Sequence, residues 1–182
     1  PFPFPFYGNN FSTLSVASNG IVSFSNSFYL WQYINASLPY ANIPDTIFAF
    51  WDDVYPRTNG VCVAVIGAAP TRQFVAQWDN SFFYVSNVPS TSLNFEVFLS
   101  ETTGTIDVLY GRMEGEGDRA TGSGATIGIQ RDSGSSFDQV GFNTAGVVGS
   151  NTSILWTPNV QAVCDGAGNC VSCNAGASCV LT

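Results

Sequence analysis

The sequence predicts an all-β chain: an antiparallel β-sandwich followed by a disulfide-stapled, irregular C-terminal tail. Apolar residues recur with a period of two in many short segments, which is the pattern of half-buried strands, whereas long segments with a helical period are absent. Glycine, proline and asparagine separate these segments at the short intervals typical of sandwiches. With 182 residues, of which 45% are hydrophobic, the chain is long enough to bury one substantial core.

The first predicted strand is the opening segment, in which proline and phenylalanine alternate over residues 1–6. In an extended backbone Phe2, Phe4 and Phe6 point to one face, which must be covered. Proline has no backbone N–H, so one side of this strand lacks donors and cannot pair with a second neighbour. We therefore expect an edge strand whose phenylalanines contact either their own domain or, by donor-strand exchange, another copy of the chain.

The next two predicted strands, residues 11–17 and 21–24, form a hairpin around the turn Asn19-Gly20. A long connection follows over 26–45, where prolines interrupt a series of aromatic residues. The other predicted strands have the same alternating character, and they cover residues 46–51, 60–66, 73–79, 82–85, 93–99, 104–110, 124–130, 137–142 and 152–157.

Two segments lack strand character: the glycine-rich stretch 111–123 and the tail from about residue 158. We therefore place the sandwich domain at residues 1–157 and a cysteine-rich tail at 158–182. A tail that cannot form a hydrophobic core needs covalent cross-links, so we expect two disulfides in preference to a zinc site. Four cysteines allow three disulfide connectivities, and the sequence does not choose among them. The cysteines concerned are Cys164, Cys170, Cys173 and Cys179.

The remaining cysteine and the glycosylation motifs bear on the compartment. Cys62 lies in an apolar run and is expected to be a buried free thiol. Three sequons, at Asn10, Asn35 and Asn151, are candidate glycosylation sites and are typical of exported chains. The chain starts at Pro1 in place of an initiator Met, as is typical of a chain trimmed from a longer precursor or of a fragment of one. Together these features predict a secreted protein, extracellular or at the cell surface.

Composition excludes several classes of function. The net charge is −8 with a pI near 4.1, so the chain offers no basic patch to nucleic acid or anionic membranes. No apolar run approaches the roughly 20 residues of a membrane-spanning helix. Histidine and lysine are absent, which removes Ser-His, Cys-His and Schiff-base catalysis. The candidate carboxylates lie side by side or among glycines and not across a cleft, so we expect no enzyme.

Asp52 and Asp53 are the candidate metal ligands. They follow an apolar strand, where carboxylates and loop carbonyls can converge on calcium, the one cofactor to which the sequence points. The alternative is that these carboxylates cap turns or pair with an arginine such as Arg57.

Aromatic residues are the candidate binding groups. Phe82, Phe83 and Tyr84 are consecutive and cannot all face one core, so part of this segment must meet water, a ligand or another subunit. Exposed aromatic faces near loops are typical of carbohydrate-binding modules, and three further candidates for such a role are Trp31, Tyr33 and Tyr40. The other tryptophans lie in apolar strands and are expected in the core: Trp51, Trp78 and Trp156.

Several motifs resemble, in order, those of nidogen-like (NIDO-type) extracellular domains. They are FPFYGNNF at 4–11, VASNGIVSF at 16–24, IFAFWDDV at 47–54, FVAQW at 74–78, FEVFL at 95–99 and TGTI at 103–106. The resemblance covers roughly residues 1–130 and implies a β-sandwich that serves as a module of larger matrix, adhesion or bacterial surface proteins. The cysteine-rich tail departs from the family's pattern.

The sequence therefore predicts a non-catalytic, secreted module for cell-surface adhesion or extracellular assembly, with a self-assembling filament subunit as the sharper form. The expected partners are proteins, either further copies of the chain or surface and matrix components. A carbohydrate-binding module is the alternative, distinguished by aromatic rings exposed together on one loop face. The residues expected to make the contacts are Phe2, Phe4, Phe6, Phe82, Phe83 and Tyr84.

Overall fold

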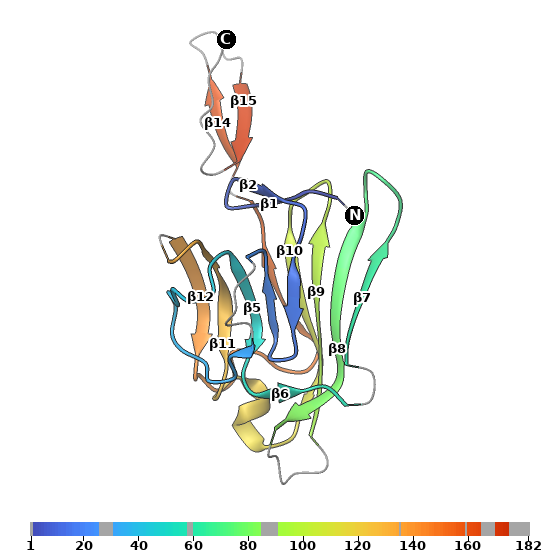
Figure 1. The fold of residues 1–182 in the computed structure, drawn as a ribbon, viewed down its shortest axis with the longest axis vertical. Coiled ribbons are helices and arrows are strands. Elements are labelled where there is room, and N and C mark those ends of the chain that lie inside the picture. The colour runs from blue at the N-terminus through green and yellow to red at the C-terminus, as the bar shows by residue number, and fades with distance from the viewer. Residues whose placement is uncertain are drawn as a thin grey trace.

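The computed structural model describes residues 2–25, 31–57, 60–84, 91–134 and 136–158, and the backbone of two tail strands at 160–164 and 170–174. These residues form strands and turns, include the short 3₁₀ helix Gly117–Thr121, and contain no α-helix. Every strand pair among them is antiparallel. The all-β, antiparallel class predicted from the sequence is confirmed (Figure 1).

The larger sheet has six strands. Across the sheet they are β13 (Thr152–Trp156), β10 (Ile106–Glu114), β9 (Ser92–Ser100) and β8 (Gln73–Phe83), followed by β7 (Val61–Ile66) and β6 (Val54–Tyr55), which both pair with the far side of β8. The sequence predicted two strands where β8 is continuous. A bulge between Trp78 and Ser81, with Asn80 at a φ of 47°, lets one strand bend where the hydrophobic pattern changes phase.

The smaller sheet has five strands. Across the sheet they are β12 (Ser136–Phe142), β11 (Thr126–Arg131), β5 (Thr46–Trp51), β4 (Ile21–Ser23) and β3 (Ser15–Ala17). The predicted turn at Asn19-Gly20 joins β3 and β4, and Gly20 has a φ of +75°. A Cβ at Gly20 would lie 2.1 Å from the Phe50 carbonyl oxygen, so this position requires glycine.

The two sheets face each other across one hydrophobic core. β5 is buried along its whole length, as expected for a strand that is apolar at five of six positions. In the larger sheet Trp78 stacks on Phe95 with ring centroids 4.8 Å apart. The hydroxyl of Tyr110 crosses the core and donates to the Ala49 carbonyl oxygen at 2.6 Å, which ties the sheets together.

The opening segment packs into its own domain. β1 (Phe4–Phe6) pairs with β2 (Asn9–Phe11), and the Phe2, Phe4 and Phe6 side chains are only 7%, 2% and 2% exposed. Phe24 stacks on Phe4 and packs at a tilt against Phe6, with ring centroids 5.7 and 4.8 Å away. Of the two arrangements that the sequence allowed, the structure has the intramolecular one, so these phenylalanines are core residues and not contact residues.

The connection after β4 covers the outer face of the smaller sheet over residues 31–45. A second apolar cluster forms there, in which Leu38 and Ile43 pack against Trp51. The buried Gln130 side chain donates to the carbonyl oxygens of Tyr40 and Ile43, at 2.8 and 2.7 Å. The connection is therefore fixed by polar as well as apolar contacts.

The tail contains a hairpin where the sequence predicted an irregular segment. β14 (Val160–Cys164) and β15 (Cys170–Asn174) pair along their whole length. Figure 1 shows this hairpin beyond one end of the sandwich, past β1 and β2. The tail side chains lie outside the described residues.

Candidate functional site

The least covered element of the sandwich is β7, an edge strand of the larger sheet. Among the described residues its one partner strand is β8, so the second side of its backbone has no strand beside it. Its sequence, VCVAVI, contains no charge and no proline, and five of its six residues are exposed. Edge strands usually carry charges, prolines or bulges that block further pairing, so β7 is unprotected.

Two of its valines are exposed on the inner face of the sheet. Residues directly opposite each other share a face, and Val63 is opposite the fully buried Ala76, while Val65 is opposite Phe74. Val63 and Val65 are nevertheless 58% and 42% exposed. The smaller sheet ends at β3, which has three residues, and leaves these valines uncovered.

An apolar groove of about 270 Å³ reaches the neighbouring strand β8. Its lining includes Phe74, the register partner of Val65, together with Leu99 and the first phenylalanines of the chain. We call β7 and this groove the open edge. The opposite side of the sandwich is bridged, because the Trp156 indole of β13 donates to the Asp138 carboxylate of β12 at 2.8 Å.

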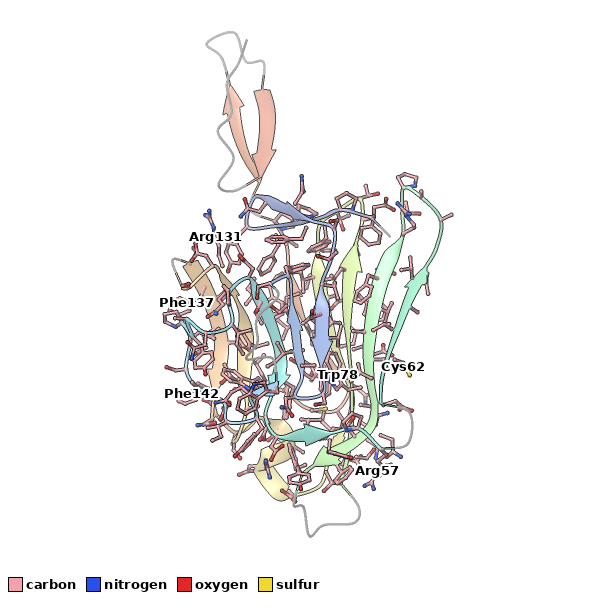
Figure 2. All side chains as sticks on the ribbon, in the orientation of Figure 1. Arg57, Cys62, Trp78, Arg131, Phe137 and Phe142 are labelled. Carbon is pink, nitrogen blue, oxygen red and sulfur yellow. The ribbon has the colours of Figure 1, made fainter. Side chains whose placement is uncertain are left out.

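Cys62 lies on β7 and is exposed (Figure 2). The prediction of a buried thiol is wrong, because the apolar run that contains it forms an edge strand and not a central one. Its neighbour in register is Gln77, a half-buried polar residue on the outer face of β8.

A second exposed patch lies where β6 meets the end of β8, and we call it the aromatic patch. Tyr55 and Tyr84, 51% and 55% exposed, lie with ring centroids 5.9 Å apart, and Tyr55 is 5.4 Å from Phe82. The guanidinium of Arg57 stands 4.5 Å over the Phe82 ring. The predicted split of the three consecutive aromatics is therefore confirmed.

Phe83 takes the opposite direction from its two neighbours. It is fully buried, in contact with Phe50 in the core, so it is not available as a contact residue. The Arg119 guanidinium lies 4.0 Å over its ring. Of the other predicted sugar-binding aromatics, Trp31 and Tyr33 are exposed on the connection, whereas Tyr40 packs on Trp51 at 5.0 Å.

The carboxylate of Asp52 is engaged by Arg119. Arg119 Nη2 and Nε donate to its two oxygens at 2.8 and 3.0 Å, and the Asp53 amide donates to it as well. Burial, and next the Asp52 charge, raise the pKa of Asp53. Calcium at Asp52 would compete with a guanidinium already in place, and the described residues contain no group of three or more acidic, cysteine or histidine side chains. The residues present therefore fit the ion-pair alternative, with Arg119 in the role expected of Arg57.

Each of the five arginines has a described partner. Besides the contacts of Arg57 and Arg119, the ion pairs are Arg72–Glu101 at 2.5 Å, Arg112–Glu114 at 2.8 Å and Arg131–Asp132 at 3.6 Å. The Arg72–Glu101 pair is reinforced by a backbone bond that joins the β7–β8 turn to the β9–β10 turn, in which the Glu101 amide donates to the Arg72 carbonyl oxygen at 2.9 Å.

A smaller pocket of about 190 Å³ lies at the end of the sandwich next to the tail. Tyr7, Asp138 and Trp156 line it together with prolines and isoleucines. Burial, and next the charge of Asp138, raise the pKa of Tyr7 to about 12.

This shift predicts a loss of stability in alkali. Between pH 10.0 and about 12 the unfolded chain releases the Tyr7 proton while the folded chain keeps it, so unfolding becomes easier as the pH rises. Replacing Tyr7 by phenylalanine should make the free energy of unfolding fall less steeply across this window. Denaturant titrations at several pH values measure the two slopes. Equal slopes in the variant and the parent chain would contradict the assignment.

The sequons occupy different environments. Asn10 and Asn151 are exposed, and their glycosylation stays a prediction. The Asn35 amide nitrogen is partly buried and donates to Thr126 Oγ1 and Asn143 Oδ1 at 3.1 and 2.8 Å. A glycan on this nitrogen would leave it one N–H, so the two bonds could not both be kept.

The cysteine chemistry of the chain is open to a direct measurement. The backbone register places Cys164 opposite Cys170, while the sulfur positions of the tail lie outside the described residues. We expect a thiol reagent to modify Cys62 alone in the native, non-reduced chain, because Cys62 is exposed and free. Mass spectrometry of the alkylated protein counts the labels. Labelling of the tail cysteines, or stoichiometric zinc, would contradict the expected disulfides.

Comparison with known proteins places the chain in a family. A sequence model described as NIDO related matches residues 1–164. The chain belongs to the NIDO-related family. No curated protein and no solved structure matches it.

The match extends the resemblance, seen in the sequence over residues 1–130, to the end of β14. Family membership supports an extracellular structural or interaction module of a kind that is generally not enzymatic. No helix within the described part of this NIDO-related domain has the length and apolar character of a membrane span.

Sequence reasoning missed the two features that matter most for contacts. Tyr55 was not among the candidate residues, because β6 has two residues and leaves no periodic signal. Val63 and Val65 look like core residues in the sequence, and only the strand order shows that they are at an edge. The absence of any charged residue over 60–71 was the available signal.

Proposed function

We propose that this NIDO-related domain is a non-catalytic module for extracellular assembly or cell-surface adhesion that binds other proteins through its open edge. The observation that supports it best is the uncharged strand β7, with an unpaired side and with Val63 and Val65 uncovered. Such a strand accepts another strand by backbone hydrogen bonds, and its exposed side chains add apolar contact.

The distribution of charge also favours the open edge as the surface that binds other proteins. Two copies that each carry a charge of −8 repel one another over most of their surfaces. Residues 60–71 contain no charge, and the nearby Arg72 is neutralised by Glu101. The open edge is therefore a place where an acidic chain can approach without electrostatic cost.

Val63→Lys tests the proposal. A lysine on β7 should block strand addition and weaken association by about tenfold or more, because edge lysines oppose pairing and a buried charge is costly. Leu155→Lys is the matched control, since Leu155 is 59% exposed and lies on β13 at the other edge of the same sheet. Sedimentation velocity over a wide concentration range measures both. Equal effects of the two substitutions, or none, would contradict binding at the open edge.

Carbohydrate binding is the second candidate, and the aromatic patch favours it. Tyr55 and Tyr84 expose rings side by side, and Arg57 supplies hydrogen-bond donors beside them. Oligosaccharide titration of the parent chain and of Tyr84→Ala distinguishes this function from protein binding. Carbohydrate binding through the aromatic patch requires saturable oligosaccharide binding that Tyr84→Ala removes and that Val63→Lys leaves unchanged.

A further inference from the structure

We infer that the open edge receives the β14–β15 hairpin of a second copy, so that copies of the chain join head to tail. The inference rests on the proposed function and names the partner of the same site. It combines two parts that, among the described residues, are each incomplete: an edge strand paired on one side only and a hairpin of two strands.

The first part is β7. It offers six residues of free strand edge, a length of about 20 Å at the usual rise per residue. None of the usual protections is present in it: it is not charged, contains no proline, and pairs with β8 through six consecutive residues without a bulge. A strand of five or six residues can therefore add to it in one regular ladder.

The second part is the tail hairpin. β14 and β15 pair through five residues each and form a sheet of two strands. A two-stranded sheet is at best marginally stable in water, and a third strand or a packed face is what normally stabilises it. Figure 1 shows the hairpin projecting past the end of the sandwich, away from the larger sheet's strands. An external strand such as β7 supplies the missing neighbour.

The two parts match in charge and in length. No charged residue occurs in Val160–Cys164, in Cys170–Asn174 or in Val61–Ile66, although the whole chain has a net charge of −8. Strongly acidic copies can therefore bring these segments together without placing carboxylates against each other. Strands of five residues also fit along a strand of six.

The hairpin of a second copy is favoured over the opening strand, residues 1–6, as the segment that adds to β7. The donor-strand role expected of residues 1–6 is not open to them, because Phe2, Phe4 and Phe6 fill their own core. Pairing of β7 with β7 of another copy would leave both hairpins at two strands. Contact between β7 and the hairpin joins different surfaces, and such heterologous contacts continue into open chains unless the rotation between copies closes them into a ring.

The experiment uses the full chain with one substitution in each part. Val63→Lys disables the edge, Val163→Lys disables the hairpin, and Leu155→Lys is the control. We expect the parent chain and the control to form oligomers that lengthen with concentration, and each of the other variants to be monomeric. An equimolar mixture of the two monomeric variants should form dimers and nothing larger, because one intact edge meets one intact hairpin in each pair. Sedimentation velocity and negative-stain electron microscopy measure the sizes.

The outcomes separate the two proposals. If Val63→Lys is monomeric while Val163→Lys still assembles, the open edge binds protein but the hairpin is not its partner, and this inference is overturned alone. Two monomeric variants whose mixture stays monomeric also overturn it. A parent chain that is monomeric at every concentration overturns both the inference and self-assembly through the open edge. Thermal unfolding checks that each variant is folded, with Val65→Lys and Val171→Lys as replacements for a variant that is not.

Discussion

Replacing Phe4 by alanine is expected to lower the free energy of unfolding by about 3–5 kcal/mol, independently of protein concentration. The Phe4 ring is 2% exposed and stacks on Phe24, so its removal leaves a cavity under β1 that the two-stranded β1–β2 sheet cannot close. The contact is made within one chain, and its loss therefore appears as the same destabilisation at every dilution. Chemical denaturation at two well-separated concentrations measures it.

Tyr84→Ala is the matched control for Phe4→Ala, since it removes an aromatic ring that is 55% exposed. Its expected effect is within about 0.5 kcal/mol. A loss of stability in Phe4→Ala that grows on dilution would mean that the opening strand docks into a neighbouring chain. That result would contradict the intramolecular packing of β1.

Replacing Arg119 by methionine is expected to lower the free energy of unfolding by about 3 kcal/mol. Methionine is apolar and of similar length, but it removes the guanidinium that lies over Phe83 and both donors to Asp52, whose side chain is 8% exposed. The cost comes from the carboxylate, which stays buried without its counter-charge. Because the Arg119 side chain is 31% exposed, water compensates part of the loss, which places the value at the lower end for a buried pair.

Arg112→Met is the control for the ion pair, because Arg112 and Glu114 are both more than half exposed. Its expected effect is below about 1 kcal/mol. The double variant Asp52→Asn, Arg119→Met should recover part of the stability lost in Arg119→Met, since it removes the uncompensated charge. Thermal and denaturant unfolding of the four proteins measure this. Equal effects of the two methionine variants would show that the Asp52 pair is no stronger than a surface pair.

Local sequence pattern was sufficient for much of the fold. The run Thr46–Trp51 has too many apolar side chains for a strand with one solvent-exposed face, and β5 is buried on both faces. The Asn19-Gly20 turn follows from the need for a positive φ between two alternating segments. The alternation in residues 1–6 fixed which side chains share a face, though not which chain covers them.

The candidate site was harder to predict because it depends on strand order. Val63 is apolar in an apolar run, and its exposure arises only because β7 is last in its sheet and β3 is short. Arg119 and Asp52 are 67 residues apart, a distance over which no local pattern pairs a charge with its partner. The tail hairpin was missed for a different reason: its cysteines and small residues resemble a stapled loop as much as a strand.

The pairing of the arginines has a consequence for proteolysis. Trypsin-like proteases cut after lysine or arginine, and this chain has no lysine and no arginine outside residues 57–131. Arg72, Arg112, Arg119 and Arg131 lie in strands or in turns whose backbone is hydrogen-bonded. Cleavage at these bonds requires the domain to open, so digestion rates there report the unfolding equilibrium. Residues 1–56 and 132–182 contain no lysine or arginine, so a complete digest would leave residues 1–57 and 132–182 as two intact peptides.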